Sequence, residues 1–154
     1  MIWFVAIVLV GIDQLIKVWA VGALAGNPAI EIIPGFFQLN YVENFGAAFG
    51  ILQNQRLIFL ALTLPFLGAV VYAMKRYQFR KPFAILVMVL TGGALGNLID
   101  RMFRGFVVDY LDVIFGNFYD FPVFNFADIC IVVSTILIAF WVIFKEKEIF
   151  ENEA

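Results

Sequence analysis

The sequence predicts an all-α integral membrane protein, a bundle of four transmembrane helices with a small extracytoplasmic β-hairpin or sheet as its cap. Of the 154 residues, 64% are hydrophobic and only 14% are charged, whereas soluble domains average about half apolar and about a quarter charged. This excess is more than one buried core can absorb. Four apolar segments also approach the length of about 20 residues that a helix needs to cross a bilayer.

The four predicted spans differ in the charged residues that they contain. The first is interrupted by Asp13 and Lys17, the second and third are uncharged, and the fourth begins at Asp128. The N-terminus has neither a basic region nor a small-residue cleavage site, so we expect a retained first helix rather than a signal peptide. The spans cover about 2–24, 57–74, 82–99 and 127–144.

The distribution of basic residues predicts the orientation. The short link "KRYQFRK" and the start of the tail, Lys145 and Lys147, fall on the same side of a four-span bundle. The positive-inside rule makes that side cytoplasmic, so both termini are expected there. We treat 1–154 as a single membrane-embedded domain, whose outer cap comprises about 25–55 and 101–126.

The first half of the outer cap carries a strand pattern. In "IEIIPGFFQLNYVEN", two β-like runs flank Pro34-Gly35, and apolar and polar residues alternate after the turn. This pattern favours a hairpin or a small sheet on the outer membrane surface. The second half, "FRGFVVDYLDVIFGNFYDFPVF", is rich in aromatic residues, which favour the membrane–water interface.

The composition excludes several kinds of chemistry. The chain has no histidine, one cysteine (Cys130) and one serine (Ser134). A serine–histidine triad therefore cannot form, and a zinc site of the usual histidine and cysteine ligands cannot either. We expect no metal and no cofactor, and we interpret Cys130 as a small packing residue. The net charge of -2 argues against a nucleic-acid partner.

Carboxylates remain as candidates for catalysis. The connection between the third and fourth helices returns to the same face, so Asp109 can reach Asp128. Two carboxylates held close together share a proton. The ionised member can take a proton from water and the protonated member can donate one to a carbonyl, which is the equipment for amide hydrolysis. The aspartates predicted at the outer end are Asp100, Asp109, Asp112, Asp120 and Asp128.

Asp128 also has a purely structural interpretation. If Asn125 is the N-cap of the fourth helix, Asp128 occupies position N3 of a capping box and its charge suits the helix dipole. The sequence leaves both interpretations open. A close-packing role is expected for Gly92 and Gly96 in "GGALG", which form a small-xxx-small pattern.

Asp13, Lys17, Asp100 and Arg101 each allow more than one interpretation. Asp13 is costly inside a span and should pair with a partner, for which Arg101, Asn44 and Lys17 are candidates. Lys17 can instead extend toward the interface. Asp100 and Arg101 form either an ion pair or part of a substrate-positioning site.

Four patches, taken in order, resemble the bacterial lipoprotein signal peptidases (signal peptidase II). They are "DQLIKVW", "ENFGAAFG", "GGALGNLIDR" with "GFVVDYLDV", and "FPVFNFADICIVV". Each patch is modest alone, but the ordered set is specific and covers essentially the whole chain.

The resemblance implies an aspartic endopeptidase of the bacterial cytoplasmic membrane with its active site at the outer face. Such enzymes remove the signal peptide of diacylglyceryl-modified prolipoproteins by cutting before the lipidated cysteine. The family's catalytic pair falls on Asp109 and Asp128, and Asp100 is implied to be structural. The resemblance also implies inhibition by globomycin. Residues implied to orient the pair or to hold the substrate are Asp13, Asn44, Asn97, Arg101 and Asn125.

Two other classes remain as alternatives. A small proton-coupled transporter is compatible with Asp13 and the outer carboxylates, although only Asp13 lies well inside a span. A non-catalytic membrane scaffold would tolerate amides at Asp109 and Asp128. We expect a monomer in contact with membrane lipid.

Overall fold

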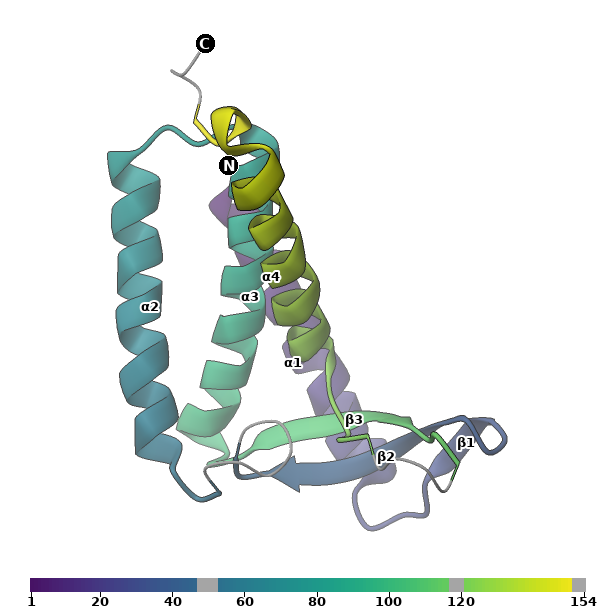
Figure 1. Cartoon of the computed structure of the whole chain (residues 1–154). Coiled ribbons are helices and arrows are strands. Elements are labelled where there is room, and N and C mark those ends of the chain that lie inside the picture. The colour runs from purple at the N-terminus through teal and green to yellow at the C-terminus, as the bar shows by residue number, and fades with distance from the viewer. Residues whose placement is uncertain (47–52, 117–120, 151–154) are drawn as a thin grey trace.

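The computed structural model describes residues 1–46, 53–116 and 121–150. Four long helices stand side by side above a small sheet (Figure 1). By length and composition all four can cross a membrane. The predicted fold class, four membrane helices with a small sheet, is confirmed. The helices are α1 (Trp3–Leu24), α2 (Arg56–Arg76), α3 (Lys81–Phe103) and α4 (Phe126–Phe144), followed by the short 3-10 helix η2 (Glu146–Glu148).

The third helix runs past the predicted end at residue 99. It continues to Phe103 because Asp100 is fully buried against protein rather than exposed to lipid or water. The amides of Arg104 and Gly105 both donate to the carbonyl oxygen of Asp100, at 2.8 and 3.1 Å. Gly105 has a φ of +90°, a conformation open to glycine, and it ends the helix.

The N-terminus, η2 and the link between α2 and α3 lie at the end of the bundle opposite the sheet (Figure 1). The basic link and Lys145 are therefore at one end. There the chain after η2 is tied to the link: the amide of Arg80 donates to the carbonyl of Ile149 at 2.8 Å, and Phe150 stacks on Phe79 with ring centroids 5.2 Å apart.

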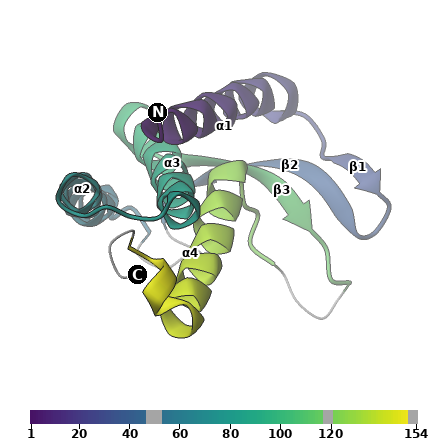
Figure 2. The same ribbon diagram turned by 90° about the horizontal axis from the view of Figure 1, so that it is seen from above.

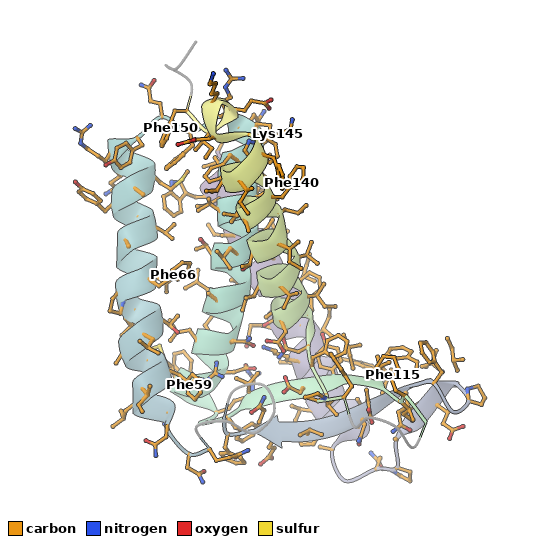
Figure 3. All side chains as sticks on the ribbon, in the orientation of Figure 1. Phe59, Phe66, Phe115, Phe140, Lys145 and Phe150 are labelled. Atoms are coloured by element: carbon orange, nitrogen blue, oxygen red, sulfur yellow. The ribbon has the colours of Figure 1, made fainter. Side chains whose placement is uncertain are left out.

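The predicted hairpin is present. Strands β1 (Ile30–Ile33) and β2 (Phe37–Asn44) pair antiparallel around Pro34-Gly35, where Gly35 adopts a φ of +69°. The sheet extends sideways from the foot of the bundle (Figure 2), and Phe115 lies toward its far end (Figure 3).

A third strand, β3 (Val107–Val113), pairs antiparallel with β2 and was not among the predicted elements. The β-branched residues of "VVDYLDV" are the sequence signal for it, next to the aromatic residues that indicated the interface. The register places Asp109 opposite Val42 and Val107 opposite Asn44. Part of "ENFGAAFG", and Asp120, lie outside the described residues.

Glycines of α3 let its neighbours approach closely, as predicted for Gly92 and Gly96. A Cβ built on Gly92 would lie 3.0 Å from Leu9 of α1. A Cβ on Gly93 would lie 2.5 Å from the carbonyl oxygen of Ala127 in α4, and one on Gly96 would overlap the carboxylate of Asp13. The backbone of α3 is therefore in contact with α1 and α4.

The second helix is attached differently. It buries Val70 in a cluster with Ala6 and Met88, and Phe66 points toward α3 (Figure 3). Nearer the sheet, Arg56 of α2 donates to the carbonyl oxygen of Met102 in α3 at 2.8 Å. Thr63 of α2 lines a cavity together with residues of α3 and α4.

The close approach of α3 and α4 can be tested with Gly93→Val. We expect the free energy of unfolding to fall by about 1–3 kcal/mol, because the new side chain must displace α4 backbone. Thermal unfolding in detergent measures this. Gly68→Val is the matched control, since a Cβ at Gly68 meets nothing within 4 Å. Equal losses in both variants would contradict the proposed contact.

Candidate active site

Asp109 and Asp128 face the same cavity at the sheet end of the bundle. Asp109 comes from β3 and is 1% exposed, and Asp128 lies in the first turn of α4. The cavity has a volume of about 620 Å³. Its polar lining is Asn44, Thr63, Asn97, Arg101, Asp109 and Asp128.

The rest of the cavity wall is apolar. Ala94 of α3 and Ile129, Val132 and Val133 of α4 line it, as do residues of the segment between β3 and α4. A polar end with two carboxylates thus adjoins an apolar chamber between helices that can span a membrane. Such a site suits a substrate with one polar group and a hydrocarbon part.

A capping box holds Asp128, as one of the two interpretations predicted. The amide of Asp128 donates to the side-chain oxygen of Asn125 at 3.0 Å, and the amide of Asn125 donates to Oδ2 of Asp128 at 3.1 Å. This leaves Oδ1 of Asp128 for Asn97, whose Nδ2 donates to it at 2.7 Å. Capping therefore orients Asp128 without removing it from the cavity.

Two amides hold Asp109. Nδ2 of Asn44 donates to Oδ2 at 2.8 Å, and Nδ2 of Asn125 donates to Oδ1 at 2.5 Å. Asn125 thus contacts both aspartates, Asp109 through its NH2 group and Asp128 through its carbonyl oxygen. One asparagine at the start of α4 fixes the two carboxyl groups relative to each other.

The pKa of Asp109 is raised to about 7, chiefly by burial and also by the nearby charge of Asp128. The hydrogen bonds from Asn44 and Asn125 act in the opposite direction and limit the rise. Asp109 therefore changes protonation near neutral pH, which suits a group that exchanges protons during a reaction. Burial also raises the pKa of Tyr110 to about 12. Its neutral hydroxyl accepts a hydrogen bond from the amide of Phe126 at 3.1 Å, at the start of α4.

Arg101 lines the cavity but does not pair with its sequence neighbour. It donates to the carbonyl of Gly46 at 3.0 Å, and its guanidinium lies over the ring of Phe59, 4.4 Å from the centroid. Asp100 instead forms ion pairs with Lys17 and Arg104. Of the two interpretations left open for these residues, the Asp100–Arg101 ion pair is wrong: consecutive helical residues point about 100° apart, so Asp100 faces Lys17 while Arg101 lines the cavity.

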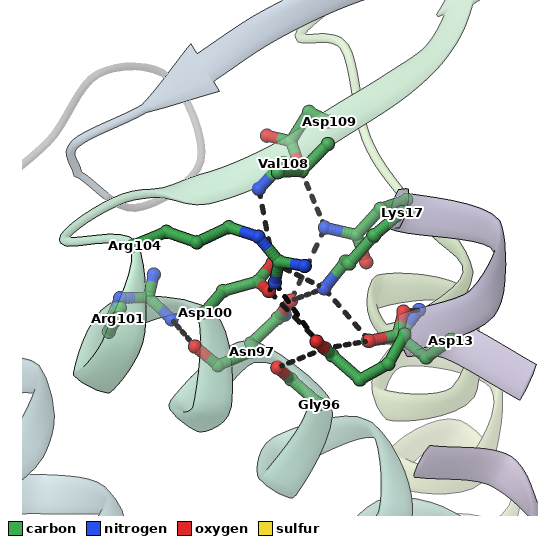
Figure 4. A network of polar contacts seen from close by, with 12 residues as sticks. Asp13, Lys17, Gly96, Asn97, Asp100, Arg101, Arg104, Val108 and Asp109 are labelled. Carbon is green, nitrogen blue, oxygen red and sulfur yellow. Dashed lines mark hydrogen bonds and ion pairs between the residues drawn. The ribbon is translucent and has the colours of Figure 1, made fainter. Parts of the chain in front are cut away.

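A buried network of ion pairs and hydrogen bonds adjoins the cavity through Asn97 and is centred on Lys17 (Figure 4). Nζ of Lys17 is 2.9 Å from Oδ2 of Asp13, 2.9 Å from Oδ2 of Asp100 and 2.9 Å from Oδ1 of Asn97. Of the three candidate partners of Asp13, Lys17 is confirmed. Asn44 contacts Asp109 and Arg101 contacts Gly46 instead. The alternative in which Lys17 extends to the interface is wrong, since the residue is 0% exposed.

Asp13, unlike most of the other predicted site residues, does not line the cavity. Its Oδ1 accepts a hydrogen bond from the amide of Ala127 at 3.2 Å, which fixes the start of α4. The structure brings Asn44, Asn97, Arg101 and Asn125 together with the two aspartates. Sequence reasoning did not assign Lys17 to the site, although its spacing of four residues from Asp13 was a usable signal.

The fold and site define a class: a membrane-embedded protein with a paired-carboxylate site at one end of its helical bundle. The family model for signal peptidase (SPase) II matches residues 5–144. The chain belongs to the signal peptidase II family. It is a multi-pass bacterial membrane protein with a membrane signal peptidase role, and a protease of the aspartic class.

Relatives and solved structures agree with this assignment. The chain is 43% identical to a lipoprotein signal peptidase of Clostridium acetobutylicum over 94% of this chain and 96% of the relative. It is 43% identical to one of Clostridioides difficile over 94% and 95%. It also resembles a bacterial membrane enzyme solved by the in meso method at 2.3 Å resolution, with a TM-score of 0.82, 35% identity, and coverage of 98% of this chain and 92% of that one.

Proposed function

We propose that the protein removes the signal peptide from diacylglyceryl-modified prolipoproteins, cutting before the lipidated cysteine. Relatives that carry the name lipoprotein signal peptidase support this substrate class. The observation that carries the proposal is that Asp109 and Asp128 face one cavity whose remaining wall is apolar. The polar end suits the scissile peptide, and the apolar wall suits the lipid chains and the signal helix.

In the proposed mechanism, Asp109 and Asp128 share one proton. The ionised carboxylate removes a proton from water while the water oxygen attacks the scissile carbonyl carbon. The protonated carboxyl donates its proton to the carbonyl oxygen, which gives a tetrahedral diol. Collapse of the diol breaks the C–N bond, a proton passes to the leaving amine, and the pair keeps one proton. Because the pair titrates as a unit, we assign no separate role to either member.

The supporting residues have distinct proposed tasks. Asn44, Asn97 and Asn125 orient the carboxyl groups through the hydrogen bonds described above. Arg101 presents a cation in the cavity and binds substrate carbonyl or headgroup oxygens. Asp13 supports the start of α4 from behind.

The same proposal includes the setting of the enzyme. We place both termini in the cytoplasm and the site at the outer face, because the basic link and Lys145 share the end opposite the sheet (Figure 1). The chain 1–154 acts as one domain and as a monomer among membrane lipids. Globomycin is the expected inhibitor.

Replacement of either aspartate tests the reaction. We expect Asp109→Asn and Asp128→Asn each to lower cleavage by at least about 100-fold, since each removes an acid–base group. The assay is a gel shift in detergent with a diacylglyceryl-modified prolipoprotein, with and without chelator, and with an unlipidated substrate for comparison. Asp112→Asn is the matched control, because Asp112 accepts from Gln38 at 2.7 Å and is not part of the cavity lining. Full activity of either variant would exclude the pair.

The raised pKa of Asp109 predicts the pH dependence. Below pH about 7 the pair holds the shared proton, and above it the proton is lost and both carboxylates are charged. We therefore expect kcat/KM to fall as pH rises through about 7, and to fall again in acid when the second carboxylate is protonated. Steady-state rates from pH 4 to 9 measure this, with samples returned to pH 6 to control for unfolding. Rates that rise continuously to pH 9 would contradict the shared proton.

A further inference from the structure

Three asparagines donate from their NH2 groups to the aspartate pair. This orientation of each side chain requires a hydrogen-bond donor to its Oδ1 atom. For two of them the chain's own backbone supplies this donor. The amide of Gly46 donates to Oδ1 of Asn44 at 2.9 Å, and the amide of Asp128 donates to Oδ1 of Asn125 at 3.0 Å. If either side-chain amide were rotated by 180°, its NH2 group would face the backbone N–H, and the hydrogen bond from that N–H would be lost.

Asn97 is held differently. Its Oδ1 accepts from Nζ of Lys17 at 2.9 Å, and more weakly from Nδ2 of Asn125 at 3.3 Å. An ammonium group has three donors and no acceptor. Lys17 can therefore face the oxygen of Asn97 but not its NH2, which then points to Oδ1 of Asp128 at 2.7 Å.

The position of Lys17 is itself fixed. Its Nζ lies between the carboxylates of Asp13 and Asp100, and the side chain is 0% exposed. With Asn97, these groups account for all three donors of the ammonium. The lysine has no freedom to turn away, so the orientation of Asn97 is set as firmly as those of Asn44 and Asn125.

We propose that Lys17 is a positioning residue for the reaction: its ammonium fixes the amide of Asn97 so that the NH2 group donates to Asp128. Lys17 does not touch the cavity, and it acts through Asn97. The inference rests on the proposed function of the aspartate pair. It differs from a purely structural role, in which Lys17 would only neutralise Asp13 and Asp100.

A double-mutant cycle separates the two roles. The variants are Lys17→Met, Asn97→Ala and the combination, each assayed for kcat and KM with lipidated prolipoprotein. We expect Lys17→Met to lower kcat by about 10- to 100-fold, as misplaced catalytic groups do, with KM changed by about twofold or less. The combination should be no slower than Asn97→Ala alone, because the two residues act in series. If the fold-losses of kcat in the two single variants multiplied in the combination, the proposal would be overturned.

Arg104→Met is the matched control. It removes the other cation that pairs with Asp100, but Arg104 has no contact with Asn97 among the hydrogen bonds of the described residues. We expect it to lower thermal stability and leave kcat within about threefold of wild type, since the donor to Asp128 remains. A loss of kcat as large as that of Lys17→Met would assign both effects to the ion network as a whole.

Folding is checked separately. If Lys17→Met does not fold, the cycle is repeated on an Asp13→Asn background, where removal of the ammonium leaves Asp100 paired with Arg104. A readout that needs no cleavage is the NMR signal of the Asn97 NH2 group, identified by its loss in Asn97→Ala. It should shift to a weakly bonded position in Lys17→Met and not in Arg104→Met, and an unshifted signal would overturn the proposal. Cleavage by wild type tests the proposed function independently.

Discussion

One buried ammonium ion at the foot of the bundle holds the structure of the site together. Lys17 lies between Asp13 and Asp100, in a part of the molecule that excludes water, and an unpaired charge there would cost several kcal/mol. The two carboxylates extend the connection to other elements. Asp100 accepts from the amide of Val108 in β3 at 3.1 Å, and Asp13 accepts from the amide of Ala127 in α4. Elements from four parts of the chain thus meet at one cluster of charges.

This cluster of charges also positions Asp109 and Asp128, one through β3 and the other through α4. Asp109 follows Val108 directly in β3, and Asp128 follows Ala127 directly in α4, so each catalytic candidate is next to a backbone amide that the cluster holds. Asn97 and Asn125 then set the side chains. Donors fixed before the substrate arrives need no rearrangement during the reaction, which is where enzymes gain most of their electrostatic stabilisation.

The sequence was sufficient for the parts that depend on local pattern. Apolar length predicted the four helices, the Pro34-Gly35 turn predicted the hairpin, and the spacing of Asn125 and Asp128 predicted the capping box. The resemblance to signal peptidase II supplied the site residues, whose functional roles stay predictions.

The features of the fold and site that the sequence did not predict depend on contacts between segments far apart in the chain. The pairing of Asp100 with Lys17 depends on which face of α3 meets α1, and the sequence alone does not state this. Strand β3 was missed because its stability comes from pairing with β2, some 65 residues earlier in the case of the Asn44–Asp109 contact. Lys17 was seen as a partner of Asp13, but its contact with Asn97 across 80 residues appears only in the fold.

The central claim is that Asp109 and Asp128 interact strongly enough to share a proton. Infrared titration of the protonated carboxyl band in wild type, Asp109→Asn and Asp128→Asn tests this directly. The account predicts a band in wild type that titrates near pH 7, is missing from Asp109→Asn, and titrates at a lower pH in Asp128→Asn because the neighbouring charge is gone. A band whose midpoint is the same in wild type and Asp128→Asn would show that the two carboxyl groups titrate independently, and would contradict the shared-proton mechanism.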